Sequence, residues 1–267
     1  MIRLIASDMD GTLLRKDGTI HQGMVPLIRK LREEGIYFVI ASGRPVFNLR
    51  NIFREVREEI GLIAFNGAWY AWGEKEYPET TVEKNVCREA ILEARKYPEL
   101  DCFLDAIDRG YVENGNSPYL RWKEAEGKVE KTDLLDVVEK DAIYRVKLSG
   151  FELDRYPSVI DDILPRFQGR AEVIRADANG VDVSGLGSGK GNALAKLQRL
   201  LGVSPAETMV FGDYYNDLSL FEYAEHRIAM ENACDELKKK ATVIAKNHDT
   251  DAVYHMLSER YRKGDWE

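Results

Sequence analysis

Two aspartates stand one residue apart at the end of the first apolar run of the chain. The stretch LIASDMDGTLL, residues 4–14, carries Asp8 and Asp10 directly before a Gly-Thr pair. On an extended strand end, residues i and i+2 point the same way, so the two carboxylates are expected to lie close together. Like charges this close repel unless a proton or a cation lies between them. The pair therefore predicts a cation site, with an ordinary Asp-Gly turn or a helix cap at Asp10 as the alternative for so short a motif.

Two further aspartates follow a later apolar run, in the segment GDYYND at residues 212–217. Asp213 and Asp217 add hard oxygen ligands, and neither motif contains a histidine or a cysteine. Such a donor set suits Mg2+, which keeps several waters and accepts an oxygen of a substrate phosphate. We therefore expect Mg2+ at the four carboxylates.

A lysine stands at the start of a predicted amphipathic helix, in GSGKGNAL at residues 187–194. Lys190 is placed against the helix dipole, because cations favour the other end of a helix. The placement makes sense if the lysine and the helix N-terminus share an anion, whereas a solvated lysine is the plain alternative. A Walker A loop is excluded, because Ser184 stands where its first glycine belongs and Gly191 follows the lysine.

Two dipeptides at predicted strand ends could line the same site. Ser42 and Gly43 offer a hydroxyl and a backbone N–H that suit a phosphate oxygen, although an ordinary Ser-Gly turn is the preferred explanation of the dipeptide taken alone. Asn66–Gly67 is a strong turn dipeptide, and beyond the turn we expect it at most to line the site.

Short continuous apolar runs alternate with helix-like segments through both terminal parts of the chain. This alternation predicts a Rossmann-like α/β fold with a doubly wound parallel sheet, in which ligands bind at the carboxyl ends of the strands. The predicted strands are Ile2–Ser7, Ile36–Ala41, Leu62–Phe65, Thr208–Phe211, Arg227–Ala229 and Ala241–Ala245. The predicted helices are Gly23–Glu34, Val46–Ile60, Lys190–Leu201, Leu218–Ala224, Cys234–Lys240 and Asp251–Arg260.

The middle of the chain has a different pattern, which predicts an inserted α+β domain over residues 83–184. Residues 1–82 and 185–267 then form the core domain together. Within the insertion we expect a helix at Val86–Lys96 and two strands in Asp101–Glu113. Tyr144–Phe151 and Val181–Gly185 alternate in polarity and predict half-exposed antiparallel strands.

Composition excludes several classes of protein. The 267 residues carry a net charge of -8, which argues against a nucleic-acid binder and against a surface that seeks anionic lipid. No apolar stretch reaches the ~18 residues of a membrane span. The three cysteines are scattered and the four histidines lack zinc-site spacing, so we expect reduced thiols, a cytoplasmic location and no zinc site. The expected partner is a small-molecule phosphate ester, with the chain as a monomer or a weak homodimer.

The motifs DMDGTLL, SGR, Lys190 and GDYYND, in this order, resemble the four motifs of the haloacid dehalogenase superfamily of phosphatases. FNGA at residues 65–68, SGKGNAL, and IAMENA at residues 228–233 are similar to the Cof-type subfamily, which acts on sugar phosphates and small metabolites. The match covers both terminal portions of the chain. The middle resembles the large type IIB cap of that subfamily mainly in length and position.

The resemblance implies a role for each matching residue. Asp8 is expected to be the nucleophile that forms an aspartyl-phosphate, and Asp10 the general acid and then the general base. The implied Mg2+ ligands are the carboxylates of Asp8 and Asp213 and the backbone carbonyl of Asp10, with Asp217 beside or among them. The groups implied to hold the phosphoryl oxygens are Ser42, the amides of Met9 and Gly43, Lys190 and Asn216.

Three alternatives accompany the expected phosphatase. A phosphotransferase or mutase would use the same residues and pass the phosphoryl group to a second sugar hydroxyl. A non-catalytic phosphometabolite-binding protein is disfavoured because every motif position is intact. An ion-pumping ATPase uses a similar nucleophile but needs membrane helices, which the sequence does not predict.

Overall fold

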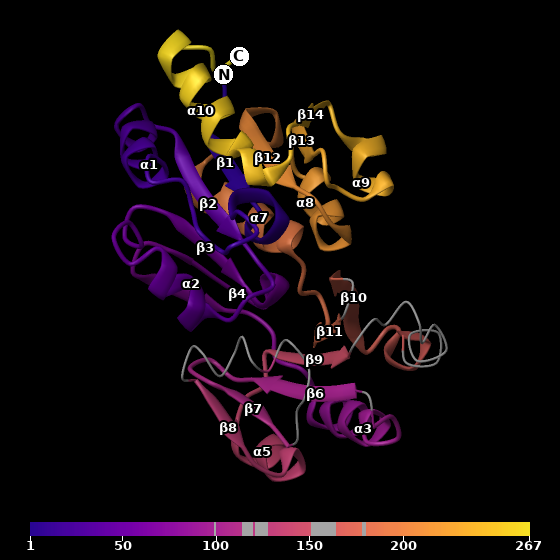
Figure 1. Cartoon of the computed structure of the whole chain (residues 1–267). Coiled ribbons are helices and arrows are strands. Elements are labelled where there is room, and N and C mark those ends of the chain that lie inside the picture. The colour runs from indigo at the N-terminus through magenta and orange to yellow at the C-terminus, as the bar shows by residue number, and fades with distance from the viewer. Residues whose placement is uncertain (99, 114–119, 121–127, 151–163, 178–179) are drawn as a thin grey trace. The chain divides into compact units, whose positions relative to one another are not determined.

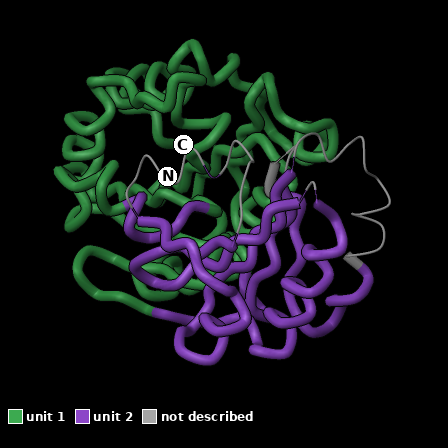
Figure 2. The backbone as a smooth tube through the Cα atoms, turned by 60° about the horizontal axis from the view of Figure 1, so that its bottom comes forward, with its two compact units in different colours: residues 1–43, 50–77, 189–267 green, residues 44–49, 78–188 purple. Residues whose placement is uncertain are grey.

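The computed structural model describes residues 1–98, 100–113, 120, 128–150, 164–177 and 180–267. The chain divides into two compact units, which are described separately (Figure 2). The first unit contains residues 1–43, 50–77 and 189–267, and the second contains residues 44–49 and 78–188. The first unit is therefore built from both ends of the chain. None of the helices in the described ranges has the length and the apolar character needed to cross a bilayer.

An eight-stranded sheet forms the centre of the first unit (Figure 1). Its strand order is β14-β13-β12-β1-β2-β3-β4-β5, and all pairs from β14 to β3 are parallel. The strands are β1 (Leu4–Ser7), β2 (Tyr37–Ala41), β3 (Gly61–Ala64), β4 (Trp69–Trp72), β5 (Lys75–Pro78), β12 (Thr208–Gly212), β13 (His226–Met230) and β14 (Val243–Ala245). Each predicted parallel strand is present, and every strand limit lies within two residues of the predicted one.

Helices cover both faces of this sheet, as the continuous apolar runs require. Every residue of β1 and β12 is buried, and neighbouring residues of a strand face opposite sides. On one side, Leu4 and Ala6 pack in a cluster with the buried faces of α7 (Lys190–Leu201), α8 (Leu218–Phe221) and α9 (Asp235–Lys240). The opposite side is covered by α1 (Met24–Glu33) and α10 (Ala252–Lys263), which contact each other. The predicted doubly wound α/β fold is confirmed.

The second unit is an antiparallel sheet with helices packed on one of its faces. The strand order is β10-β11-β9-β6-β7-β8, and only the β7–β8 pair is parallel among the described strand pairs. Its elements are α3 (Lys84–Ala94), β6 (Leu100–Asp105), β7 (Gly110–Val112), β8 (Val129–Lys131), α5 (Leu134–Lys140), β9 (Arg145–Gly150), β10 (Ala171–Asp177) and β11 (Gly180–Gly185). Both helices bury apolar residues against Leu104, Val146 and Val183. The helix at Val86–Lys96 and the strand pair in Asp101–Glu113 were therefore predicted correctly.

The prediction that β9 and β11 are half-exposed was wrong. All six residues of each strand are buried, so the alternation of polar and apolar residues does not mark a solvent-facing side. The polar side chains pair instead. Arg145 donates to Asp105 and, through Nη1 at 3.2 Å, to Asp182, whose other oxygen lies 3.5 Å from Lys147 Nζ. Phe151, the last residue of the predicted strand, lies outside the described residues.

This buried charge cluster makes a stability prediction. Replacing Asp182 with alanine removes the carboxylate that Arg145 and Lys147 share, and leaves two buried cations with less compensation. Breaking a buried pair in this way costs about 3–5 kcal/mol, which we expect in the unfolding free energy of the second unit by urea titration. The matched control is Arg88→Ala, which breaks the exposed pair with Glu139 and should cost less than about 1 kcal/mol. Equal losses in the two variants would contradict a stabilising role for the cluster.

Two further differences concern helix length and a missed hairpin. The helix predicted over residues 46–60 ends early, as α2 (Val46–Ile52). Beyond it, the N–H groups of Val56 and Glu59 donate to the carbonyls three residues earlier, so this part of the chain forms turns. The buried residues Phe53 and Val56 lie in these turns at the three-residue spacing of a helix, which explains why the sequence pattern predicted a longer helix. Strands β4 and β5 were not predicted, although the aromatic run WYAW favours a strand. β4 pairs antiparallel with β3 after the turn at residues 65–67.

Candidate active site

The carboxyl ends of β1, β2 and β12 bring three sequence motifs to one edge of the sheet. Ser7 lies opposite Ile40 on β2 and Phe211 on β12, so the residues that follow share this edge. The Asp8 N–H donates to the Phe211 carbonyl at 3.0 Å, which fixes the chain where the first motif begins. Beyond it the backbone is no longer a regular strand, since residues 9–13 form an irregular helical turn.

Lys190 joins the first and last motifs through direct contacts. Its Nζ lies 2.6 Å from Asp8 Oδ1 and 2.6 Å from Asp217 Oδ1, and its side chain is completely buried. The second oxygen of Asp217 accepts from the backbone N–H of Asp213 and of Tyr214. Lys190 is therefore not a solvated lysine. The cation that lies against Asp8 in this structure is its ammonium group.

Asp213 is held on both of its carboxylate oxygens. Thr12 Oγ1 donates to Asp213 Oδ1 at 3.2 Å, and Asn232 Nδ2 lies 3.3 Å from Asp213 Oδ2. The same Asn232 amide donates to the Gly11 carbonyl at 2.8 Å. The turn after the first aspartate pair is thus fastened to the last motif by two polar side chains.

Burial and mutual repulsion raise the pKa of two carboxyl groups. Burial and the charge of Asp217 raise the pKa of Asp8 to about 7, although Lys190 acts against this. Burial and the charge of Asp8 likewise raise the pKa of Asp213 to about 9. Burial acts to lower the pKa of Lys190, but the carboxylates of Asp217 and Asp8 outweigh it and raise that pKa. The site therefore holds more negative charge than its single lysine compensates, which favours an added cation.

The remaining predicted residues lie in the segments that follow β1, β2 and β12. Asp10 is exposed, whereas Asp8 is buried, so the two carboxylates lie in different surroundings. The Met9 side chain is buried, which leaves its backbone for a ligand. Ser42 follows β2, and the Asn216 amide donates to Asn66 Oδ1 at 3.2 Å. The catalytic and binding roles assigned to these residues stay predictions.

Two residues of the site, Thr12 and Asn232, were missed in the sequence, and a third, Asn66, was expected at most to line the site. Thr12 and Asn232 hold Asp213, and Asn66 contacts Asn216. Thr12 lies two residues after Asp10, and Asn232 lies in the IAMENA segment. Their closeness to these motifs was the one feature of the sequence that could have marked them as site residues. Which polar side chain near a motif turns inward depends on tertiary contacts.

The donor set fits a hard divalent cation. Asp8, Asp213 and Asp217 each offer a carboxylate oxygen, and these oxygens lie within 4.8 Å of one another. Asp8 Oδ2 is buried and has no hydrogen-bond partner among the described residues. A buried carboxylate oxygen without a partner is costly, and a bound Mg2+ would supply what it lacks. Asp8 offers this oxygen to the ion. Asp213 is held by neutral donors at 3.2 and 3.3 Å, whereas Lys190 holds Asp217 at 2.6 Å.

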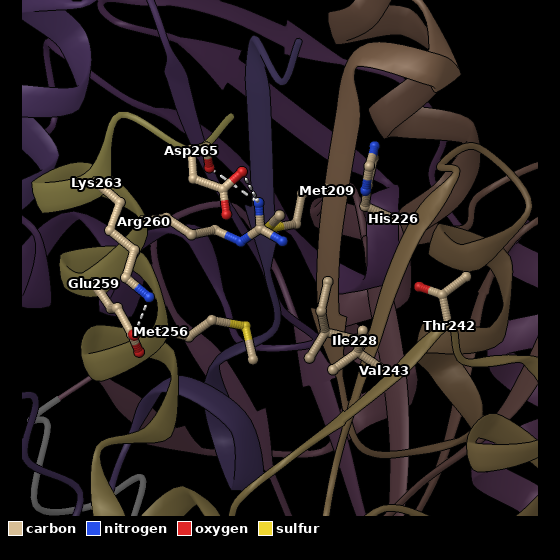
Figure 3. A pocket seen from close by; sticks show the side chains of 10 residues that line it. All are labelled: Met209, His226, Ile228, Thr242, Val243, Met256, Glu259, Arg260, Lys263 and Asp265. Carbon is tan, nitrogen blue, oxygen red and sulfur yellow. Dashed lines mark hydrogen bonds and ion pairs between the residues drawn. The ribbon is translucent and has the colours of Figure 1, made fainter. Parts of the chain in front are cut away.

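A pocket of about 220 Å³ lies elsewhere in the first unit (Figure 3). Met209 and His226, from the amino-terminal halves of β12 and β13, line it, whereas Asp213 follows the other end of β12. Its charged residues pair with one another, with Lys263 2.7 Å from Glu259 and Arg260 beside Asp265. None of the predicted site residues lines this pocket.

Comparison with known proteins places the chain in a family. The family model described as haloacid dehalogenase-like hydrolase matches residues 5–257. The 5-amino-6-(5-phospho-D-ribitylamino)uracil phosphatase YwtE of Bacillus subtilis is 25% identical over 289 residues, covering 97% of this chain and 98% of its own. A second 5-amino-6-(5-phospho-D-ribitylamino)uracil phosphatase, YbjI of Escherichia coli, is 27% identical over 270 residues, covering 97% of this chain and 96% of its own.

Solved structures agree with the fold. A haloacid dehalogenase-like hydrolase from Bacteroides thetaiotaomicron has a TM-score of 0.82 and 25% identity, covering 97% of this chain and 99% of its own. SMU.1108c from Streptococcus mutans has a TM-score of 0.87 at 23% identity, covering 98% and 100%. Since the family model spans nearly the whole chain and the curated relatives are phosphatases, this protein belongs to the haloacid dehalogenase-like hydrolases and is a phosphatase of the Cof type.

Proposed function

We propose that the protein is a Mg2+-dependent phosphomonoester hydrolase that acts on small phosphorylated metabolites, sugar phosphates in particular, in the cytoplasm. The observation that carries this proposal is the state of the Asp8 carboxylate. One of its oxygens is held by Lys190 at 2.6 Å, and the other is buried without a hydrogen-bond partner among the described residues. An oriented carboxylate of this kind, beside a lysine and further carboxylates, suits attack on a phosphoryl group whose charge must be compensated.

Asp8 and Asp10 would divide the chemistry between them. A carboxylate oxygen of Asp8 attacks phosphorus, the ester P–O bond breaks, and Asp10 donates a proton to the leaving oxygen. In the second step Asp10 takes a proton from water, which attacks phosphorus and releases inorganic phosphate while Asp8 regains its carboxylate. The exposure of Asp10 supports this division, because its proton must exchange with the leaving group and with water.

Lys190 and the strand-end donors would hold the transferring group. The ammonium of Lys190 orients Asp8 and offsets negative charge on the phosphoryl oxygens, and Asp217 keeps the lysine in place. Ser42, the amides of Met9 and Gly43, and Asn216 would donate to those oxygens. Mg2+ held by Asp8 and Asp213 would add positive charge where the phosphoryl group binds.

The choice of sugar phosphates rests on the relatives. Two curated relatives are named as phosphatases of 5-amino-6-(5-phospho-D-ribitylamino)uracil, a phosphate ester of a sugar-alcohol chain. Since these relatives are 25% and 27% identical to this chain, their substrate need not be its own. A phosphorylated polyol or sugar is the chemical class that we expect to be hydrolysed fastest.

The proposal is tested by measuring phosphate release from a panel of esters, with Mg2+ and with excess EDTA. The panel contains sugar and sugar-alcohol phosphates, nucleotides, flavin mononucleotide and pyridoxal phosphate. We expect release with Mg2+, its loss in EDTA, and its return when excess Mg2+ is added back. Release that persists in EDTA would exclude the metal requirement, and preference for nucleotides would exclude the substrate class.

A further inference from the structure

Three consecutive residues after β3 adopt backbone conformations that L-residues rarely adopt. Phe65, Asn66 and Gly67 have φ values of 49°, 54° and 99°, and all three are buried. Two neighbouring residues with side chains in the left-handed region are uncommon, and the conformation costs more free energy at Phe65 than at Asn66, because asparagine tolerates this region better than most residues. Glycine adopts it without that cost. Glycine at residue 66 would also satisfy the turn, so the conformation alone does not require the asparagine side chain, and its contacts decide its role.

The turn at residues 65–67 contacts two segments of the predicted phosphate site. One contains Ser42 and Gly43, and the other ends at Gly189, directly before Lys190. The Asn66 N–H donates to the Ser42 carbonyl at 3.1 Å. Its side chain lies against Gly43, where an added Cβ would meet Asn66 Oδ1 at 3.0 Å. Gly67 packs so closely that a Cβ there would lie 2.2 Å from the carbonyl oxygen of Gly189, the residue before Lys190. The backbones of both segments are therefore placed by this one turn.

The side chain of Asn66 also fixes a third segment. Its Oδ1 accepts a hydrogen bond from Asn216 Nδ2 at 3.2 Å. The two hydrogens of a planar amide have fixed directions, so committing one of them to Asn66 sets the direction of the other. Asn216 lies next to Asp217, which holds Lys190. The turn therefore contacts the GDYYND segment as well as the segments of Ser42–Gly43 and Gly189.

We propose that Asn66 is a positioning residue of the phosphate pocket: it orients the Asn216 amide and fits against Gly43, so that both present donors to a phosphoryl group. This role rests on the proposed phosphatase function. It differs from a purely structural role for the turn, because the conformation alone is available to glycine whereas the orientation of Asn216 requires the Asn66 side chain.

Asn66→Gly separates the two roles, because it keeps the left-handed backbone and removes only the amide. The readouts are the dissociation constant of inorganic phosphate with Mg2+ present, by calorimetry, the kcat and KM for a phosphate ester, and the melting temperature. We expect phosphate to bind about tenfold more weakly, as for loss of one oriented hydrogen bond, with an unchanged or higher melting temperature. Asn85→Gly, at an exposed asparagine on helix α3 of the second unit, should leave phosphate affinity unchanged.

Five outcomes would overturn this role. Phosphate affinity within twofold of the wild type would show that the amide is not needed. Weaker affinity with an equally large effect in Asn85→Gly, or with a marked fall in melting temperature, would indicate general disruption. An equal effect of Asn66→Gly with and without Asn216→Ala would show that Asn66 does not act through Asn216. A folded wild type that neither binds phosphate nor hydrolyses any ester would instead overturn the proposed function, and this role with it.

Discussion

Replacing Asp8 with asparagine is expected to reduce phosphate-ester turnover by about 10,000-fold or more while the protein stays folded. Asparagine has nearly the same shape but cannot form the acyl phosphate, and loss of a nucleophile removes most of a covalent enzyme's rate enhancement. The measurement is kcat for the best ester of the panel at saturating Mg2+. Phosphoryl transfer to the protein, followed with a radiolabelled ester and rapid acid quench, should label the wild type and not the variant.

Asp8→Asn is also expected to change how the stability of the protein depends on pH. In the folded, Mg2+-free protein, burial and the charge of Asp217 raise the pKa of Asp8 from 3.8 to about 7. Between about pH 4 and pH 7 the folded protein therefore holds a proton that the unfolded chain has released, so stability from this group is lost as pH rises through that range.

Asparagine carries no ionisable proton and avoids this loss. In EDTA, the Asp8→Asn variant should melt at a higher temperature than the wild type at pH 8, and the difference should shrink at pH 5. Thermal unfolding at the two pH values measures it. A variant that is less stable than the wild type at pH 8 in EDTA would mean that the ion pair with Lys190 outweighs the cost of burying the Asp8 charge.

Replacing Lys190 with methionine is expected to have the second largest effect. Methionine fills much of the same volume but leaves the carboxylates of Asp8 and Asp217 buried without their shared cation. Removing one partner of a buried ion pair costs about 3–5 kcal/mol of stability, and the transition state also loses a positive charge that is worth about 100-fold or more in turnover. Urea unfolding in EDTA and kcat with Mg2+ measure the two effects.

Lys196→Met is the matched control, since Lys196 lies on the same helix α7 and is only partly buried. It should change stability and turnover little. Added Mg2+ should restore part of the stability of Lys190→Met, because the ion replaces some of the missing positive charge. Stability of Lys190→Met equal to that of the control would contradict the structural role assigned to this lysine.

Local patterns predicted the first unit more accurately than the second. A strand buried on both faces leaves a short continuous apolar run, and all six such runs are parallel strands in the structure. In the second unit, alternation of polar and apolar residues in β9 and β11 suggested a solvent-facing side. Alternation shows only that two faces differ, and Asp105, contributed by another strand, helps to make the polar face a buried one.

Part of the candidate site could likewise be predicted from the sequence and part could not. Its aspartates, Lys190 and the strand-end residues could be identified from the sequence, because their types and their places after apolar runs limit the chemistry that they can do. The contacts by which some residues hold others could not be predicted from the sequence. Thr12, Asn232 and Asn66 contact residues 201, 19 and 150 positions away, and no local pattern encodes such a contact.

The sequence by itself determined the class of fold, the chemical nature of the site and the residues expected to react. Those features follow from periodicity, composition and motif spacing, which are properties of neighbouring residues. Only the tertiary structure decided which carboxylate is buried against Lys190, which oxygen of Asp8 lacks a hydrogen-bond partner among the described residues, and which side chains orient Asp213 and Asn216. These depend on the approach of segments far apart in the chain, and burial and charge compensation exist only after those segments have packed together.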